Sequence, residues 1–372
     1  MVLFGYGLVI RFFLPKKDPL RIIGFQPFTM IVDAFETKRF IKQKIDNINS
    51  IDYPIEKKNI IFISDLEEKD VKKFKTEYPE ITFVVNDNKQ EAYLNAFKII
   101  DTDVIVFTDA ETKLQKYSLR NVIECLNGKI AAVSGYFYLS DEPLKSYHKS
   151  KIKYHESIWN LNYLEGCIDT SSILNPRLLA VRRSLFKDFD KITGSDINGD
   201  LGNSAQKYVT RLIPDELPFF LRRQGLKGLT DHKASLFEES PESTKSELQK
   251  IAEKTARDIK VSYKNIDFLF NLKYGVFGLL TFPFRRFFIV HFPFLIVLAG
   301  IYAIFYFPLI TTFAVIFFSI YLYVSKNTYP FVFLLGVTIG WFEYITSKKT
   351  GGSLFKNGAK SILNGQEHQN VD

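Results

Sequence analysis

The chain has 372 residues and carries 49 lysines and arginines against 41 aspartates and glutamates, a formal net charge of +8. This length accommodates one large domain or two smaller ones and excludes a single small binding module. The two cysteines, Cys125 and Cys167, cannot build the disulfide framework of a small secreted domain, and their spacing fits neither a zinc nor a redox motif. With 46% hydrophobic and 24% charged residues, the composition excludes an intrinsically disordered chain.

Residues 1–24 begin with an apolar run over residues 2–14 that contains one charged residue, Arg11. A helix that crosses a bilayer needs about 20 apolar residues, so this run is too short for a span. No basic region precedes it and no small-residue cleavage site follows it, which argues against a signal peptide. We therefore expect residues 1–24 to form an apolar anchor at the membrane interface or a shallow insertion.

Residues 25–263 alternate between short apolar runs rich in β-branched residues and stretches with apolar residues at helical spacing. The pattern predicts strands at 28–32, 59–64, 81–85 and 103–107, with helices between them at 38–48, 71–75 and 90–100. Apolar strands separated by helices are typical of a parallel sheet that is covered on both faces. The predicted fold class is α/β, with a doubly wound, mostly parallel sheet.

Acidic residues follow all four predicted strands: Asp33, Asp65, Asp87, and Asp109 with Glu111. In such sheets ligands bind at the carboxyl ends of the strands, where these side chains converge. Like charges on one edge repel each other unless a cation or hydrogen-bond donors lie among them, and a metal ion with a nucleotide meets that need. The chain contains neither GxGxxG nor GxxxxGK[ST], which argues against a dinucleotide-binding fold and a P-loop.

Four segments of this region resemble the nucleotide-sugar half of the family 2 glycosyltransferases, which have a GT-A fold. They are PFTMIVDAFETKRFIKQKIDNINSIDYP, NIIFISD, KQEAYLNAF and VIVFTDAE. Asp65 stands where the family has the aspartate that hydrogen-bonds the nucleobase, while Asp33 and Glu36 replace a proline and an asparagine of the family pattern. The resemblance implies a substrate-binding set of Asp33, Glu36, Asp65, Lys89 and Asn95.

The segment Asp109-Ala110-Glu111 is similar to the DxD element of this family, in a DxE form. Two carboxylates separated by one residue at a strand end can point to the same side. The resemblance implies that Asp109 contacts the sugar or ribose and that Asp109 and Glu111 hold a divalent cation bridging the diphosphate of the donor. A site of hard oxygen ligands favours Mg²⁺ or Mn²⁺.

Two later segments resemble parts of the same family that contact the diphosphate or the acceptor. Residues 177–186 are similar to a segment that lines the acceptor and diphosphate side, which makes Arg182 and Arg183 candidate substrate contacts. Processive members carry a QxxRW motif where this chain has KTARD, so Arg257 is a further candidate contact of the diphosphate. The missing tryptophan argues against a synthase of the cellulose or hyaluronan type.

The segment DELPFFLRRQG at 215–225 resembles the family's acidic helix start, whose carboxylate is the general base of inverting enzymes. A base is needed because the acceptor hydroxyl loses its proton as it attacks the anomeric carbon. Asp215 is the first candidate for this catalytic role and Glu216 the second. A structural alternative is that Asp215 caps the amino terminus of the helix.

Residues 287–324 contain no charged side chain, which predicts two transmembrane helices joined by a turn near Pro308. A third apolar stretch at 328–346 contains one acid, Glu343, so residues 287–346 are expected to form two to three spans. Residues 264–286 are aromatic and end in Arg285 and Arg286, and we expect them to form an amphipathic segment at the interface. Residues 347–372 form a polar tail.

The positively charged flanks of these spans give conflicting topologies. Arg285 and Arg286 precede the first span, whereas Lys348 and Lys349 follow the third on the opposite side of the membrane. Either the third segment is re-entrant or the run at 2–14 also enters the bilayer. The catalytic domain is expected on the cytoplasmic side of a multi-pass membrane protein.

Together these features predict a membrane-bound, metal-dependent inverting glycosyltransferase. The expected donor is a UDP- or GDP-sugar and the expected acceptor is linked to a lipid, such as a polyprenyl carrier. Two alternatives are a short polysaccharide synthase and a catalytically silent nucleotide-sugar-binding membrane protein. Membrane lipids are expected partners. Nucleic acid is not an expected partner, because residues 25–263 contain no basic stripe with interleaved aromatic residues.

Overall fold

The computed structural model describes residues 2–12, 14–35, 37–139, 146–186, 216–238, 244–309, 312 and 329–350. Within them lies an eight-stranded sheet with the order β3-β2-β1-β4-β7-β6-β8-β5. Its strands are β1 (Phe28–Asp33), β2 (Lys58–Ser64), β3 (Thr82–Val85), β4 (Val104–Asp109), β5 (Lys113–Leu114), β6 (Ile130–Leu139), β7 (Leu179–Arg182) and β8 (Lys227–Glu238). The described α-helices are α1 (Val2–Phe12), α2 (Ile41–Asn49), α3 (Glu68–Glu77), α4 (Lys89–Lys98), α5 (Ser118–Glu124), α6 (Ser146–Ile168), α9 (Leu217–Arg223), α10 (Thr244–Lys264), α11 (Phe288–Tyr306) and α13 (Tyr329–Thr350).

The first four strands confirm the predicted α/β pattern. β1 pairs in parallel with β2 and β4, and β2 pairs in parallel with β3. The rest of the sheet is mixed, because β7 is antiparallel to both β4 and β6, and β5 is antiparallel to β8. The sheet is therefore less uniformly parallel than the sequence predicts.

Successive residues of the central strands pack on opposite faces of the sheet. Met30 of β1 belongs to one buried cluster, which includes Ile41 and Ile45 of α2. The next residue, Ile31, belongs to a second cluster, which includes Ala92 of α4. Alternate side chains of a strand point to opposite faces, so an apolar run of this kind requires a helix layer on each side. These layers leave the carboxyl edge of the strands accessible to ligands.

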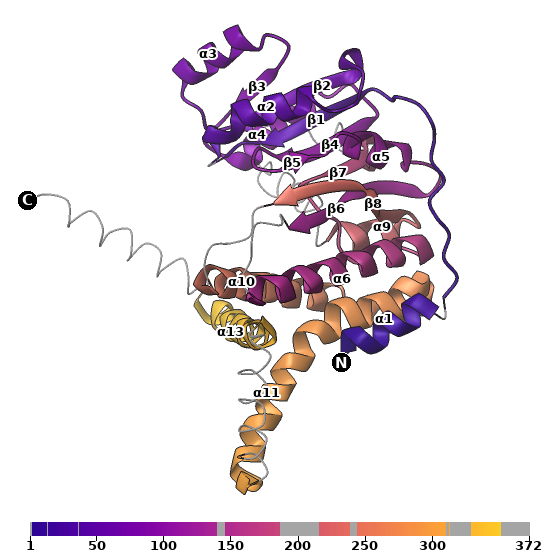
Figure 1. The fold of residues 1–372 in the computed structure, drawn as a ribbon, viewed down its shortest axis with the longest axis vertical. Helices are drawn as coiled ribbons and strands as arrows, with labels where there is room; N and C mark the ends of the chain where they lie inside the picture. Colours follow the sequence, from indigo (N-terminus) through magenta and orange to yellow (C-terminus); the bar gives the residue numbers. More distant parts are fainter. Residues whose placement is uncertain are drawn as a thin grey trace, which may run out of the picture.

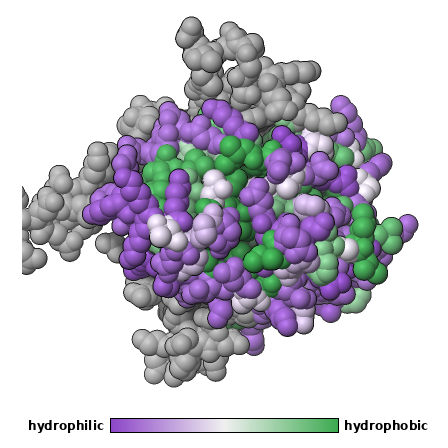
Figure 2. All heavy atoms as spheres, turned by 90° about the horizontal axis from the view of Figure 1, so that it is seen from above, coloured by the Kyte–Doolittle hydropathy of each residue, from purple (hydrophilic) through white to green (hydrophobic). Residues whose placement is uncertain are grey.

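The described elements fall into two regions in Figure 1. The sheet and its helices form the upper region, and α6, α10, α1 and α13 lie below it. From there α11 extends away from the rest of the molecule (Figure 1). Seen from the end opposite α11, the surface is mainly hydrophilic, with apolar residues gathered in smaller areas (Figure 2).

One helix in the described part of the chain, Phe277–Tyr306, is long and apolar enough to cross a membrane. It begins with two π-helical turns, Phe277–Thr281 and Pro283–Phe287, and continues as α11. Only 6% of its most apolar window is buried inside the protein, so most side chains of that window are at least partly exposed on the surface. The expected second span falls almost entirely outside the described residues, so two to three spans remain a prediction.

The third predicted span corresponds to α13, whose apolar part, Val332–Thr346, is a shorter helix. α13 packs closely along α10. A Cβ on Gly336 would lie 2.6 Å from Cγ2 of Ile251, and one on Gly340 would lie 2.6 Å from the carbonyl oxygen of Ala252. These two glycines let the two helix backbones approach one another, so α13 is held against α10.

Arg285 and Arg286 are both 2% exposed, and each forms a buried ion pair. Arg285 Nε lies 2.7 Å from Glu165 Oε1 on α6, and Arg286 Nη1 lies 2.9 Å from Asp258 Oδ1 on α10. Tyr6 of α1 donates a further hydrogen bond to Glu165 at 3.0 Å. The side chains of both arginines are therefore directed into the protein rather than toward headgroups, and the topology argument based on them loses its support.

The segment before α11 nevertheless carries exposed apolar side chains. Ile266, Phe270, Leu272 and Leu279 are exposed, while Phe268 packs in a buried cluster against Phe219 of α9. Ile266, Leu272 and Leu279 lie on short helical turns, η4 (Ile266–Phe268), η5 (Leu272–Tyr274) and the first π-helical turn, and Phe270 lies in the turn between η4 and η5. This arrangement is consistent with an amphipathic segment but replaces the single regular helix that such a segment usually forms.

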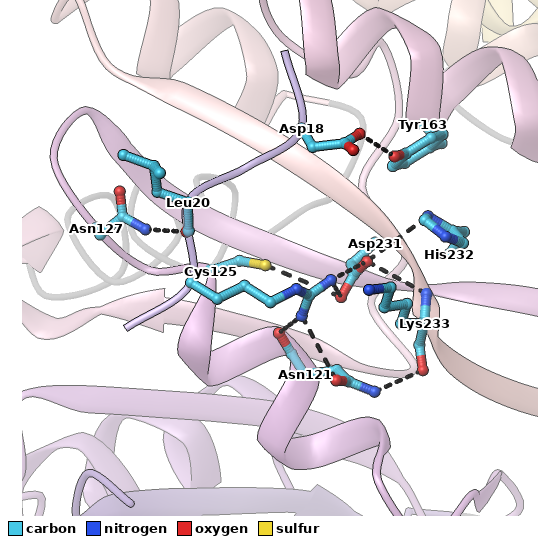
Figure 3. Close-up of polar contacts among 10 residues, drawn as sticks. Asp18, Leu20, Asn121, Cys125, Asn127, Tyr163, Asp231, His232 and Lys233 are labelled. Atoms are coloured by element: carbon cyan, nitrogen blue, oxygen red, sulfur yellow. Dashed lines mark hydrogen bonds and ion pairs between the residues drawn. The ribbon is translucent and has the colours of Figure 1, made fainter. Parts of the chain in front are cut away.

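Residues 14–27 form an N-terminal strap that runs along the side of the molecule from α1 to β1 (Figures 1 and 3). Asp18 accepts a hydrogen bond of 2.7 Å from the Tyr163 hydroxyl on α6. Arg21 forms a two-pronged ion pair with the fully buried Asp231 of β8, at 2.9 Å to each oxygen. The backbone of Ile22 then donates to Glu124 of α5. The strap thus fixes the position of α1 relative to the sheet.

We expect Arg285→Met to lower the free energy of unfolding by about 3–5 kcal/mol, because it leaves the Glu165 carboxylate buried without its cation. The measurement is chemical unfolding of the detergent-solubilised protein. Lys69→Met is the control, because the Lys69–Glu67 pair is largely exposed and contributes little. Equal stability of the wild type and the Arg285 variant would contradict the prediction.

Both cysteines are free and buried, and we expect neither thiol to react in the folded protein. Burial, assisted by the Asp231 carboxylate, raises the pKa of Cys125 to about 12, and burial also raises the pKa of Cys167. Since the thiolate is the reactive form, N-ethylmaleimide at pH 8 should modify neither residue before unfolding and both afterwards. Mass spectrometry measures the outcome, and rapid labelling of the folded protein would refute it.

Candidate functional site

The candidate site lies at the carboxyl edge of β1, β2 and β4. Asp33 and Asp109 are the last residues of two adjacent parallel strands, and their Cα atoms are direct partners in the register. The amide of Ala110 donates to the Asp33 carbonyl at 2.9 Å, which extends the pairing beyond the strands. Asp65 directly follows β2, on the other side of β1. The structure therefore brings three of the predicted carboxylates to one edge.

Asp33 is surrounded by donors from the loop and helix that follow the strands. Its Oδ2 atom lies 2.5 Å from Lys89 Nζ and 3.4 Å from the hydroxyl of Tyr93, one turn further along α4. Its Oδ1 atom accepts the amide of Phe35 at 3.2 Å. Burial, with the adjacent Asp33 carboxylate, raises the pKa of Tyr93 well above its ordinary value. Tyr93 is therefore a neutral hydrogen-bond donor at physiological pH.

Asp109 begins a tight turn that carries Glu111. Its Oδ1 atom accepts the amide of Thr112 at 2.8 Å, and its Oδ2 atom lies 3.4 Å from Arg177 Nε. Arg177 precedes β7, which runs antiparallel to β4 and so begins beside the end of β4. Glu111 is exposed at the edge. One acid of the DxE element is thus fixed in position and the other is accessible to solvent.

Buried polar atoms without a hydrogen-bond partner are concentrated at this edge. Of nine such side-chain atoms in the described part of the chain, five lie here: Thr37 Oγ1, Ser64 Oγ, Asp65 Oδ1, Thr112 Oγ1 and Asn175 Nδ2. Buried polar groups are normally paired, and leaving one unpaired costs free energy. A cluster of unpaired donors and acceptors at the carboxyl edge of a sheet is the arrangement expected where a polar ligand binds.

Lys44 lies beneath this edge on α2 and is 1% exposed. Its Nζ atom donates to Thr108 Oγ1 at 2.9 Å and to the Thr112 carbonyl at 2.7 Å. Burial lowers the pKa of Lys44 to about 7, although the Asp109 carboxylate opposes the shift. A buried lysine thus supports both ends of the turn that carries the DxE element.

Several predicted site residues lie elsewhere. Arg182 is opposite Val104, the first residue of β4, which is roughly 16 Å from Asp109 at about 3.3 Å per residue. The amide of Arg183 donates to Asp103 at the same end. Arg257 is exposed on α10. Asn95 points away from Asp33 because it is two residues beyond Tyr93 on α4, and it accepts from Lys98.

Of the two candidates for the general base, Glu216 lies within the described residues and Asp215 does not. Glu216 precedes α9 and forms an ion pair of 2.6 Å with Lys264 of α10. Asp215 and the substrate candidate Glu36 lie outside the described residues. The structure therefore leaves the base assignment as a prediction.

Three residues of the site were missed from the sequence: Lys44, Tyr93 and Arg177. Lys44 lies in the apolar stripe formed by Ile41, Ile45 and Ile48 of α2, and a charged residue on such a stripe is buried with the core. That periodicity could have identified it. Tyr93 and Arg177 lack a comparable pattern, because their contacts with the aspartates depend on how distant segments pack.

The residues at the edge fit a divalent cation that arrives with a diphosphate. No group of three or more metal-ligating side chains occurs within the described residues. Mg²⁺ is commonly held by one or two carboxylates, with waters and substrate phosphates completing its shell. Asp109 and Glu111 supply two carboxylates of the hard-oxygen type that such ions prefer. These two carboxylates are therefore suited to a cation that is shared with a substrate, rather than to a cation that is enclosed by protein ligands alone.

No protein-family model and no curated protein matches the chain in sequence. Among solved structures, the chain is similar to the mannosyltransferase PcManGT from Pyrobaculum calidifontis, whose structure is in complex with GDP-Man and Mn²⁺. The TM-score is 0.67, over 92% of this chain and 94% of that chain, at 14% sequence identity. The chain therefore has the fold of that glycosyltransferase, and the coverage extends the likeness beyond the sheet to the helical end.

Proposed function

We propose that this protein is a metal-dependent glycosyltransferase that uses a nucleotide-sugar donor. The observation that carries the proposal is the convergence of Asp33, Asp65 and Asp109 at one sheet edge, among unpaired buried polar atoms. The fold shared with a mannosyltransferase that binds GDP-Man and Mn²⁺ supports it. A GDP-sugar, with GDP-mannose first, is therefore the donor to test before UDP-sugars.

Each carboxylate at the edge has a proposed role in holding the donor. Asp65, whose Oδ1 atom is buried and unpaired, binds the nucleoside. Asp33, with Lys89 and Tyr93, forms the adjacent wall. Asp109 and Glu111 would hold Mg²⁺ or Mn²⁺, and the bound ion would supply Lewis-acid stabilisation of the charge on the departing diphosphate. Arg182 and Arg183 are left out of this proposal because they lie at the opposite end of β4.

The proposed reaction inverts the configuration at the anomeric carbon of the transferred sugar. An acceptor hydroxyl attacks that carbon as its proton passes to a carboxylate, and the bond to the nucleoside diphosphate breaks. Asp215 is the first candidate for this base and Glu216, one residue later at the start of α9, is the second. A hydroxyl acceptor needs such a base, whereas a phosphate acceptor already carries its nucleophilic oxygen in ionised form.

The acceptor is proposed to be linked to a membrane lipid, such as a polyprenyl carrier. The apolar helix Phe277–Tyr306 supports this part of the proposal, because its outward-facing side chains suit a lipid environment. Leu8, Val9 and Phe12 of α1 add exposed apolar surface. A cytoplasmic catalytic domain and more than one membrane span belong to the same proposal.

The first test measures release of nucleoside diphosphate from GDP- and UDP-sugars by purified protein with Mn²⁺ and a lipid extract. We expect Mn²⁺-dependent release from one GDP-sugar, with GDP-mannose the first candidate. Asp109→Asn should lower kcat/KM by more than about 100-fold, since loss of an outer partner of a metal alone costs 10–100-fold. Asp101→Asn, before the opposite end of β4, is the matched control and should leave the rate unchanged. Tight metal-dependent binding without release would instead indicate a catalytically silent binding protein.

The second test separates the two kinds of acceptor. Asp215→Asn should lower kcat by about 100-fold or more for a hydroxyl acceptor, because a positioned base contributes roughly 10²–10⁴-fold. With a polyprenyl phosphate acceptor the same change should leave kcat nearly unaltered. Glu216→Gln provides the comparison at the neighbouring acid. An unaffected Asp215 variant with a hydroxyl acceptor would remove Asp215 from the mechanism.

A further inference from the structure

Among the fully buried basic residues in the described part of the chain, Lys44 differs from Arg285 and Arg286 in what surrounds it. Arg285 and Arg286 each face a carboxylate at less than 3 Å. Among the described residues, the hydrogen-bond partners of Lys44 are two uncharged oxygens, and no carboxylate forms an ion pair with it. Burying an ammonium group without a partner of opposite charge is unfavourable, so Lys44 is costly for the fold where it stands.

The contacts of Lys44 belong to a closed ring around the Asp109 turn. Lys44 donates to the Thr112 carbonyl, and the Thr112 amide donates to Asp109 Oδ1 at 2.8 Å. Asp109 Oδ2 lies 3.4 Å from the side chain of Arg177, whose carbonyl accepts the Thr108 hydroxyl at 2.7 Å. Thr108 Oγ1 in turn accepts from Lys44. The Nζ atom of Lys44 therefore holds the residues on both sides of the DxE element.

Other contacts of α2 serve as a comparison. Three residues further along the helix, Asn47 exchanges two hydrogen bonds of 2.8 Å with the backbone of Leu114, which docks α2 on β5. Lys42 lies on the outer face of α2 and forms an exposed ion pair with Glu77. Among the described residues, neither Asn47 nor Lys42 forms a hydrogen bond or ion pair with the segment from Thr108 to Thr112. Helix docking and support of the turn thus come from different side chains.

We propose that Lys44 is a positioning residue that orients Asp109 and Glu111 for the divalent cation and the diphosphate of the donor, without touching either. This inference rests on the proposed function, since it assigns the cation to those two carboxylates. Removing the ammonium group leaves the Thr112 carbonyl without its donor and frees the turn from α2. The carboxylates then lose the fixed geometry that cation binding requires.

The test compares Lys44→Met with two matched variants, Asn47→Ala and Lys42→Met. Binding of Mn²⁺ in the presence of GDP is measured by electron paramagnetic resonance, and the KM for Mn²⁺ is measured separately from kcat. Lys44→Met should weaken Mn²⁺ binding about 10- to 100-fold, the range typical of outer partners of metal ligands, with a smaller change in kcat at saturating metal. Asn47→Ala should lower the thermal stability of the protein, but its affinity for Mn²⁺ should stay within about twofold of the wild type. Lys42→Met should change neither.

Hydrogen exchange of the metal-free protein provides a readout that does not depend on activity. In Lys44→Met the amides from Asp109 to Leu114 should exchange faster than in the wild type, whereas the Lys42 variant should match the wild type. If Lys44→Met does not fold, Thr108→Val removes one partner of the ring at nearly constant volume and should weaken Mn²⁺ binding in the same direction. Wild-type affinity and exchange in a folded Lys44 variant, or an equal loss in Asn47→Ala, overturns the inference. Wild-type protein that binds no Mn²⁺ with GDP overturns the proposed function instead.

Discussion

The candidate site depends on the parallel register between β1 and β4. This register sets the ends of the two strands side by side, so Asp33 and Asp109 are direct neighbours. A slip of one residue would turn every side chain of β1 to the opposite face, which the burial of Met30 and Ile31 on opposite sides of the sheet opposes. Hydrophobic packing therefore holds the carboxylates together against their mutual repulsion.

Two ion pairs with buried carboxylates connect this sheet to the apolar helix and to α1. The pair of Arg285 with Glu165 fixes the start of the helix against α6, and the pair of Arg21 with Asp231 fixes the strap that leads to α1. Buried ion pairs add little net stability over apolar contacts but are costly to separate. Their effect is to define one arrangement of the sheet relative to the helix.

The features predictable from the sequence are those that depend on local pattern. Strand and helix alternation gives the α/β fold, and the position of an acid directly after a strand gives Asp33, Asp65 and Asp109. The side chains that contact these acids are determined by packing between segments that are distant in the sequence. No local periodicity in a single sequence indicates such packing. Residues 177–186 illustrate the limit. Arg177, at the start of the segment, reaches Asp109. Arg182 lies at the opposite edge of the sheet, because β7 runs antiparallel to β4.

The cations at the carboxyl edge fall into two classes that follow from exposure. Lys89 and Arg177 are partly exposed, and each is paired with one of the aspartates, which reduces the repulsion among the carboxylates of this edge. Partly exposed pairs contribute little free energy, so the pair of Arg177 with Asp109 can be separated at small cost. Lys44 is buried, bonds only to uncharged oxygens among the described residues, and does not compete for the carboxylate. The pair of Arg177 with Asp109 can therefore be separated while the contacts of Lys44 stay in place, which is what a support for the turn requires.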